Sequence, residues 1–174
     1  MARYHGGIEV PPLSRAQLRM EALALWRVLG LDRRKEFPVM QMLEHGLYGL
    51  YPDYEFSVET MGAMGDDHGR SYPDSHRILI REDVYSGACE RRGRDRFTVM
   101  HEISHLLLHE GVPVALKRSS ADIPAYRNSE WQADALAGEI LMPNPEIRGM
   151  TVQEIASVYG VSANAAMTQL KASR

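Results

Sequence analysis

The spacing of hydrophobic residues along the chain predicts a mostly helical protein. Residues 15–29 place apolar side chains at helical intervals between charged ones, namely Leu18, Ala22, Leu25, Trp26 and Leu29. Ser14 is a residue type that caps helix N-termini, and Gly30 is a type that ends helices. The same reasoning predicts further helices at residues 39–47, 97–109, 129–142, 152–159 and 162–172.

A different pattern covers residues 55–60, where polar and apolar residues alternate and predict a half-buried strand. One face of that strand would carry Phe56, Val58 and Thr60. Residues 77–81 predict a second strand that pairs with the first, and the polar segment 65–69 is interpreted as a loop or hairpin connection. Because the chain has no repeat and no linker, we expect one domain over residues 1–174, and the mixture of predicted helices and strands indicates the α+β class.

Composition narrows the class of protein. A hydrophobic fraction of 44% is too high for a disordered chain. Lysine and arginine number 20 against 23 acidic residues, a balance that argues against bulk electrostatic binding to nucleic acid. The single cysteine, Cys89, cannot form an internal disulfide, which fits a reducing cytoplasm. No stretch approaches the roughly 20 apolar residues of a membrane span, and the N-terminus lacks the hydrophobic region of a signal peptide, so we expect a cytoplasmic protein.

Residues 90–96 form a charged run with four arginines and two acidic residues. We interpret the run as a solvated loop and first helical turn rather than as a binding patch. Asp95 and Arg96 directly precede the next apolar helix and are expected to cap or support it.

The strongest chemical motif is a His-Glu-x-x-His sequence on that helix. His101 and His105 are four residues apart, so both can face one metal ion. Glu102 is turned about 100° from His101, which places its carboxylate beside the metal, where it can take a proton from a water molecule as general base. Zinc suits this donor set, although a His-His-Glu set also tolerates manganese.

A catalytic zinc site needs a third protein ligand. The candidates are His109, Glu110, Asp122 and Glu130. Glu130 is favoured because it opens the next predicted helix, with Asp134 one turn later on the same face. This Glu-x-x-x-Asp pair resembles the arrangement in gluzincins, where the Glu binds zinc and the Asp orients a zinc-bound His. His109 is interpreted as a helix-end side chain bonded to a carbonyl, or as a residue that supports a ligand, rather than as a ligand itself.

Tyr126 lies four residues before Glu130. Its hydroxyl group is a candidate for stabilising a developing oxyanion, with simple packing as the alternative.

Residues 95–109 and 129–143 resemble the two motif helices of the ImmA/IrrE metallo-endopeptidases, and residues 84–88 and 12–14 fit more weakly. The resemblance implies a zincin-like fold, namely a small antiparallel or mixed sheet packed on a mostly helical domain, with zinc between the two helices. It also implies an intracellular protease that cuts a helix-turn-helix repressor of a mobile element or stress response. The residues that match the family's zinc ligands are His101, His105 and Glu130, and the match to its general base is Glu102. Two residues depart from the family pattern: Ser104 stands where Gly is common, and Asp134 stands where Asn is frequent.

The C-terminal subregion, residues 148–174, resembles a helix-turn-helix. Its second helix would be the recognition helix of a DNA-binding protein. That helix offers only Asn164, Gln169 and Lys171 as base-reading residue types among many alanines. We therefore expect a packing or partner-docking unit and no direct contact with nucleic acid.

Three functions are compatible with the sequence. The favoured one is a zinc-dependent endopeptidase with a protein substrate, acting through Glu102 as the proton acceptor and donor. The second is a metal-binding regulator or antitoxin-like protein that docks a partner without cutting it. The third is a hydrolase of small molecules, which would need a narrow pocket instead of a peptide-width groove. The sequence does not define the oligomeric state.

Overall fold

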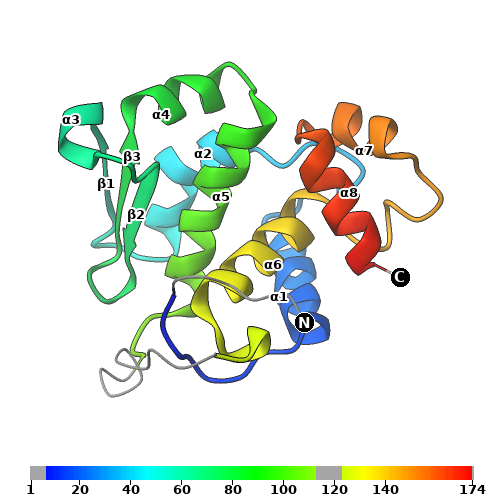
Figure 1. Ribbon diagram of the computed structural model, residues 1–174, viewed down its shortest axis with the longest axis horizontal. Coiled ribbons are helices and arrows are strands. Elements are labelled where there is room, and N and C mark those ends of the chain that lie inside the picture. The colour runs from blue at the N-terminus through cyan, green and yellow to red at the C-terminus, as the bar shows by residue number, and fades with distance from the viewer. Residues whose placement is uncertain (1–6, 113–122, 174) are drawn as a thin grey trace.

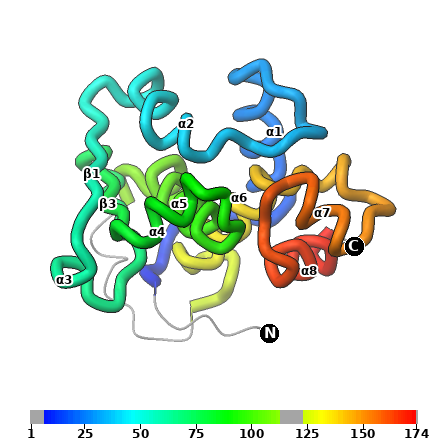
Figure 2. The backbone as a smooth tube through the Cα atoms, turned by 90° about the horizontal axis from the view of Figure 1, so that it is seen from above, coloured from blue at the N-terminus to red at the C-terminus, as the bar shows by residue number. Residues whose placement is uncertain are grey.

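The computed structural model describes residues 7–112 and 123–173. The elements in chain order are α1 (Arg15–Val28), α2 (Val39–Glu44), η1 (Gly46–Gly49), β1 (Glu55–Glu59), α3 (Met61–Met64), β2 (Gly69–Tyr72), η2 (Pro73–Ser75), β3 (Arg77–Arg81), α4 (Glu82–Cys89), α5 (Gly93–Leu108), η4 (Ala125–Arg127), α6 (Ser129–Leu141), α7 (Val152–Tyr159) and α8 (Ala163–Ala172). Together these elements form a mostly helical molecule with a small sheet at one end, packed against α4 and α5, and the last two helices at the other end (Figures 1 and 2). The predicted α+β fold class is confirmed.

The sheet is mixed, with strand order β1-β3-β2. β1 and β3 pair in parallel, with Glu55 opposite Arg77, and β2 pairs antiparallel to β3. The predicted pairing of the first and second strands is therefore present, but the segment between them is more than a loop because Gly69 begins β2. On the predicted apolar face of the edge strand β1, Phe56 is partly buried, whereas the side chain of Val58 is 42% exposed.

Most of the predicted helices are present, and local signals explain their ends. In α1, Ser14 and Gln17 form a capping box, and Gly30 adopts a φ of +64°, as expected of a residue that follows a helix. The predicted helix at 39–47 is shorter, ending at Glu44 before the separate turn η1. Helices α3 and α4 were not predicted.

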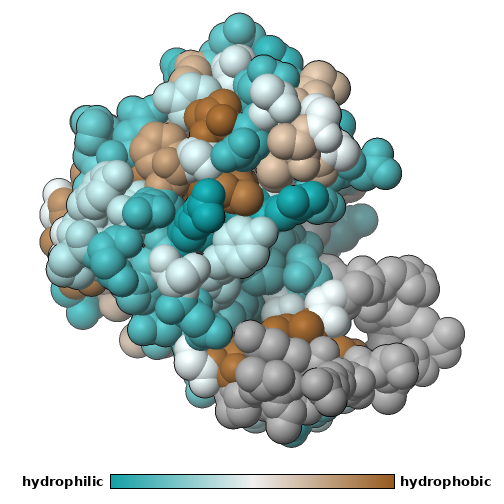
Figure 3. Space-filling model, turned by 90° about the vertical axis from the view of Figure 1, so that its left-hand side faces the viewer, coloured by the Kyte–Doolittle hydropathy of each residue, from teal (hydrophilic) through white to brown (hydrophobic). Residues whose placement is uncertain are grey.

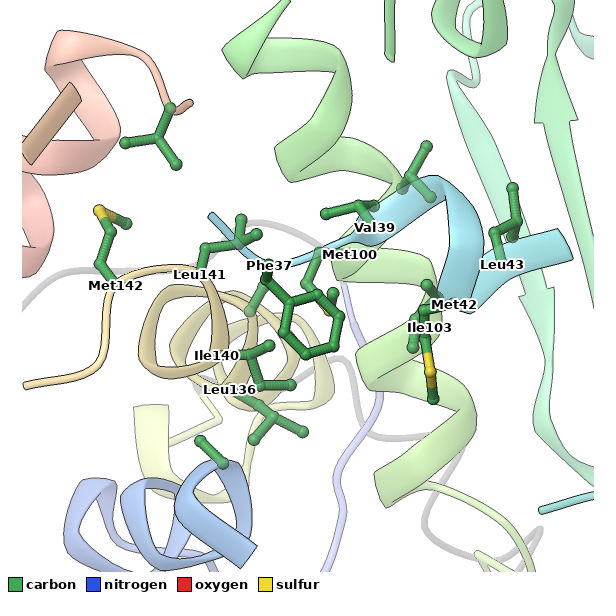
Figure 4. Packing of buried hydrophobic residues seen from close by; sticks show 14 of the residues in the cluster. Phe37, Val39, Met42, Leu43, Met100, Ile103, Leu136, Ile140, Leu141 and Met142 are labelled. Carbon is green, nitrogen blue, oxygen red and sulfur yellow. The ribbon is translucent and has the colours of Figure 1, made fainter. Parts of the chain in front are cut away.

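The core lies where α1, α2, α5 and α6 meet. Figure 4 shows Phe37 between α5 and α6, with Met100 and Ile103 on one side and Leu136 and Ile140 on the other. All five side chains are fully buried or nearly so. This packing holds α5 and α6 side by side (Figure 1). It thereby fixes how the candidate site residues on the two helices lie relative to one another.

Buried ion pairs join α1 to α6 and join the segment before α2 to α5. Glu139 on α6 is 1% exposed and accepts hydrogen bonds from Arg15 (3.0 Å) and Arg19 (3.1 Å) of α1. Arg96 is 4% exposed, pairs with Glu36 and donates to the carbonyl oxygen of Phe37. The expectation that residues 90–96 are solvated is therefore wrong for Arg96, whose burial fits the predicted supporting role.

The helix pair α7 and α8 packs against α6 at the end of the molecule away from the sheet (Figure 2). Gln169 of α8 is 2% exposed, and its amide donates to the carbonyl oxygen of Met142. One of the three residues that a recognition helix would offer to DNA is thus turned into the protein.

The face that carries the sheet is mainly hydrophilic, with small separate hydrophobic patches (Figure 3). Among the described residues, no helix has both the length and the apolar character needed to cross a membrane.

Candidate metal centre

Helices α5 and α6 bring His101, His105 and Glu130 together, and we call these three residues the metal centre. The two histidine Nε2 atoms lie 3.0 Å apart. The Glu130 carboxylate lies 3.2 Å from Nε2 of His101 and 3.4 Å from Nε2 of His105. The candidate ligand atoms all lie within 4.8 Å of one another, so a single metal ion fits between them. Glu130 is placed by the start of α6, where the side chain of Asn128 caps the helix.

Three carboxylates lie around His101, those of Asp134, Glu130 and Glu102. Nδ1 of His101 lies 2.8 Å from the Asp134 carboxylate, which makes Asp134 the partner that orients this ring. Burial opposes a charge on His101, but its contacts with Asp134, Glu130 and Glu102 outweigh burial and raise its pKa to about 10. The hydrogen bonds from His101 and His105 lower the pKa of Glu130. A partly buried site that favours positive charge and offers two imidazoles and a carboxylate fits a divalent metal.

The Nδ1 atom of His105 faces a second histidine instead of a carboxylate. Nδ1 of His105 lies 3.0 Å from Nδ1 of His109, and Nε2 of His109 lies 3.2 Å from the Oε1 atom of Gln132. Burial, together with the neighbouring His105, lowers the pKa of His109 to about 4. The ring of His109 is thus uncharged at neutral pH, and it bonds to a side-chain carbonyl oxygen and to His105, a candidate ligand.

Glu102 lies beside the metal centre and faces strand β2. Its side chain is 8% exposed, and one carboxylate oxygen accepts a hydrogen bond of 2.8 Å from Ser71 Oγ. Burial raises the pKa of Glu102, while His101 and the bond from Ser71 act against this rise. A raised pKa suits a carboxylate that must take up a proton and release it again. Ser71 was missed at the sequence level because β2 itself was not predicted.

These residues line a cleft of about 680 Å³, which we call the metal cleft. One wall comes from β2 and η2, another from the N-terminal arm at Gly7 and Ile8, and the floor from α5 and the start of α6. A neighbouring space of about 330 Å³ shares Gly69, His101 and Glu102 with it. The candidate ligands therefore face a cleft that has a second space beside it.

Gly69 leaves the room that Glu102 occupies. A Cβ atom at Gly69 would lie 2.6 Å from Cγ of Glu102 and 2.8 Å from its Oε1. We expect Gly69→Ala to displace the Glu102 carboxylate and, if Glu102 is the general base predicted from the sequence, to lower the kcat of the reaction by about 100-fold, because a shift of roughly 1 Å in a catalytic group has an effect of that size. KM and zinc affinity should change little. Steady-state kinetics and zinc titration would measure this, with Gly62→Ala as the control, since a Cβ there meets only Thr60 Oγ1 at 4.0 Å. Unchanged kcat in Gly69→Ala would show that Glu102 is not held by this contact.

Two further predicted site residues, Glu110 and Tyr126, lie away from the metal centre. Glu110 lies 3.2 Å from His76 instead of contacting the candidate ligands. Asp122 lies outside the described residues. Tyr126 belongs to η4, is 49% exposed and is absent from the lining of the metal cleft, so its catalytic role stays a prediction.

His76 links the turn before β3 to the end of α5. Its ring lies 2.7 Å from the Asp53 carboxylate and stacks on Tyr51. The hydrogen bond with Asp53, together with Glu110, raises the pKa of His76, and the same bond lowers the pKa of Asp53.

This pair predicts a pH-dependent contribution to stability. Because the pKa of His76 is raised, its protonated form stabilises the folded state fully below the usual histidine pKa of about 6.5, and the contribution is lost as the pH rises through the raised value. We expect His76→Asn to lower the free energy of unfolding more at pH 6 than at pH 9. Asn tolerates the backbone φ of +46° at this position. Urea titrations would measure the effect, with His45→Asn as the control because that side chain is 77% exposed. Equal losses at both pH values would contradict the ion pair.

One helix carries the His-Glu-x-x-His motif, and the other supplies a carboxylate as the third candidate ligand. This arrangement is of the metallopeptidase type. A family model described as the IrrE N-terminal-like domain, of the peptidase M78 family, matches residues 57–171. The chain belongs to this family. Membership implies a divalent metal ion, in agreement with the donor set of the metal centre.

Individual relatives agree with the family assignment. The chain is 30% identical to the radiation response metalloprotease IrrE of Deinococcus deserti over 182 aligned positions, which cover 92% of this chain and 56% of that protein. Among solved structures, a transcriptional regulator of Mycobacterium tuberculosis matches with a TM-score of 0.57 at 15% identity, over 88% of this chain and 46% of that one. The second match shows the shared fold. The chain spans about half the length of the relatives it matches.

Proposed function

We propose that the chain is a zinc-dependent endopeptidase. The observation that carries this proposal is the position of Glu102, which lies beside the His101, His105 and Glu130 set in an open cleft and is held by Ser71 at 2.8 Å. A ligand set alone would suit a structural metal. A buried carboxylate with a raised pKa next to the set supplies the general base that hydrolysis needs.

The reaction follows from the groups around the cleft. Zinc, when bound, would polarise the scissile carbonyl group and acidify water. Glu102 accepts the proton of the attacking water and then donates it to the nitrogen of the leaving amine. Ser71 keeps the Glu102 carboxylate in place during both transfers. Asp134 accepts a hydrogen bond from His101 and so keeps Nε2 of that ring directed at the centre.

We propose a protein substrate, namely a helix-turn-helix repressor of a mobile element or stress response, and a cytoplasmic place of action. The family resemblance supports the substrate class. The size of the metal cleft supports a peptide chain rather than a small molecule, because the cleft of about 680 Å³ adjoins a second space at Gly69.

The test is to incubate the zinc-loaded protein with helix-turn-helix proteins encoded beside its gene and to weigh the products by mass spectrometry. We expect two fragments whose masses add up to the substrate plus one water molecule. A chelator should stop the cleavage, and added zinc should restore it. If every such partner stays intact both in this assay and on co-expression, the proposed protease function is wrong.

A further inference from the structure

The side-chain amide of Gln132 has only one favourable orientation. Gln132 is 1% exposed, and its Nε2 atom donates to the carbonyl oxygens of Pro11 (2.8 Å) and Tyr126 (2.9 Å). A flipped amide would place its oxygen against these two carbonyl oxygens, and all three atoms are acceptors. Gln132 Oε1 must therefore face His109, at 3.2 Å from its Nε2 atom.

This orientation determines the protonation of two histidines. Since Gln132 Oε1 can only accept, His109 must carry its proton on Nε2. Nδ1 of His109 lies 3.0 Å from Nδ1 of His105, so only one of these two atoms can carry a proton. A metal ligand needs a free lone pair on Nε2, so the proton belongs to Nδ1 of His105, and Nδ1 of His109 presents a lone pair. His105 must donate its Nδ1 proton to that lone pair. The lone pair of its Nε2 atom is thereby left free on the side of His101 and Glu130.

We propose that Gln132 and His109 are positioning residues that set the tautomer and ring direction of His105. This inference rests on the proposed function, because it takes His105 as a metal ligand. We call the chain of hydrogen bonds from the backbone of Pro11 and Tyr126 through Gln132 and His109 to His105 the relay. It differs from the support of His101, which receives a charged carboxylate from Asp134. The relay orients a ligand without adding another negative charge to the buried centre, which already holds Glu130 and Glu102.

Zinc affinity tests the relay separately from peptide cleavage. We expect His109→Leu and Gln132→Leu to weaken zinc binding by about 10–100-fold, the usual effect of losing a group that orients a ligand. His109→Gln should restore most of the affinity, because its amide oxygen can accept from His105 while its amide nitrogen donates to Gln132. Ser104→Ala is the matched control, since it removes a buried hydrogen bond on the same helix, from Ser104 to the carbonyl oxygen of Met100, outside the relay. Competition with a chelator of known affinity would give each dissociation constant, and thermal unfolding of the metal-free proteins would show that each variant is folded.

Nitrogen-detected histidine NMR on the zinc-loaded wild-type protein gives a second readout that needs no variant. We expect His105 protonated on Nδ1 and His109 protonated on Nε2 alone. A His109 protonated on Nδ1 would overturn the relay, because two N–H groups would then face each other. Equal zinc affinity in His109→Leu and wild type would also overturn it, as would a loss in His109→Gln as large as that in His109→Leu. Wild-type protein that fails to bind zinc would instead overturn the metal centre on which the proposed function rests.

Discussion

Replacement of Glu102 by Gln is expected to lower the kcat of peptide cleavage by about 10²–10⁴-fold, the range for removal of a general acid–base. The amide has nearly the same size as the carboxylate, and its oxygen can still accept the hydrogen bond from Ser71. It cannot take a proton from the attacking water, so the reaction loses its base while the cleft keeps its shape. The zinc content and dissociation constant should stay within a few-fold of wild type, as measured by metal analysis and chelator competition.

A carboxylate outside the cleft provides the control for this change. Glu55→Gln alters an exposed side chain at the start of β1 and should leave both cleavage and zinc binding unchanged. Full cleavage by Glu102→Gln would exclude the proposed mechanism. If the variant loses cleavage but keeps the whole biological effect of the protein, then the chain acts by docking its partner and the alternative of a non-proteolytic regulator is correct.

The geometry of the metal centre follows largely from short-range spacing. His101 and His105 are one helical turn apart, and so are Glu130 and Asp134, so each pair lies on one face as soon as its helix forms. The sequence also contains the signal that starts α6, the capping residue Asn128. What spacing alone cannot show is that the two faces meet, because that depends on the packing of α5 against α6 around Phe37 (Figure 4).

The part of the site that holds Glu102 could not be predicted, because β2 has no hydrophobic pattern. Its sequence, Gly-Arg-Ser-Tyr, contains no aliphatic residue. The burial that stabilises this part of the sheet comes from Ile78 and Ile80 of the neighbouring strand β3. A strand that depends on its partner for burial carries almost no signal of its own, and Ser71 and Gly69 were missed together with it.

Contacts between remote segments account for the other differences. Arg96 was assigned to a solvated run, but Glu36, 60 residues earlier, pairs with it and allows its burial. The carbonyl oxygen of Pro11 and the amide of Gln132 are 121 residues apart in sequence. Pairs this far apart in sequence leave no signal in a local pattern. Each pair is explained in the structure, because a buried polar group needs a hydrogen-bond partner.

Replacement of Glu130 by Gln is expected to weaken zinc binding by more than about 100-fold, beyond the 10–100-fold effect of changes outside the ligands. The amide keeps the volume of the side chain but removes the negative charge that lies 3.2 Å from His101 and 3.4 Å from His105. Cleavage should be lost at zinc concentrations that saturate the wild type. Asp134→Asn gives the matched comparison, because its amide oxygen can still accept the hydrogen bond from His101, and its zinc affinity should fall by no more than about 10-fold. Chelator competition on the three proteins would give this ranking. Wild-type zinc affinity in Glu130→Gln would mean that the third ligand is another residue, whereas a larger loss in Asp134→Asn than in Glu130→Gln would reverse the roles of the two carboxylates on α6.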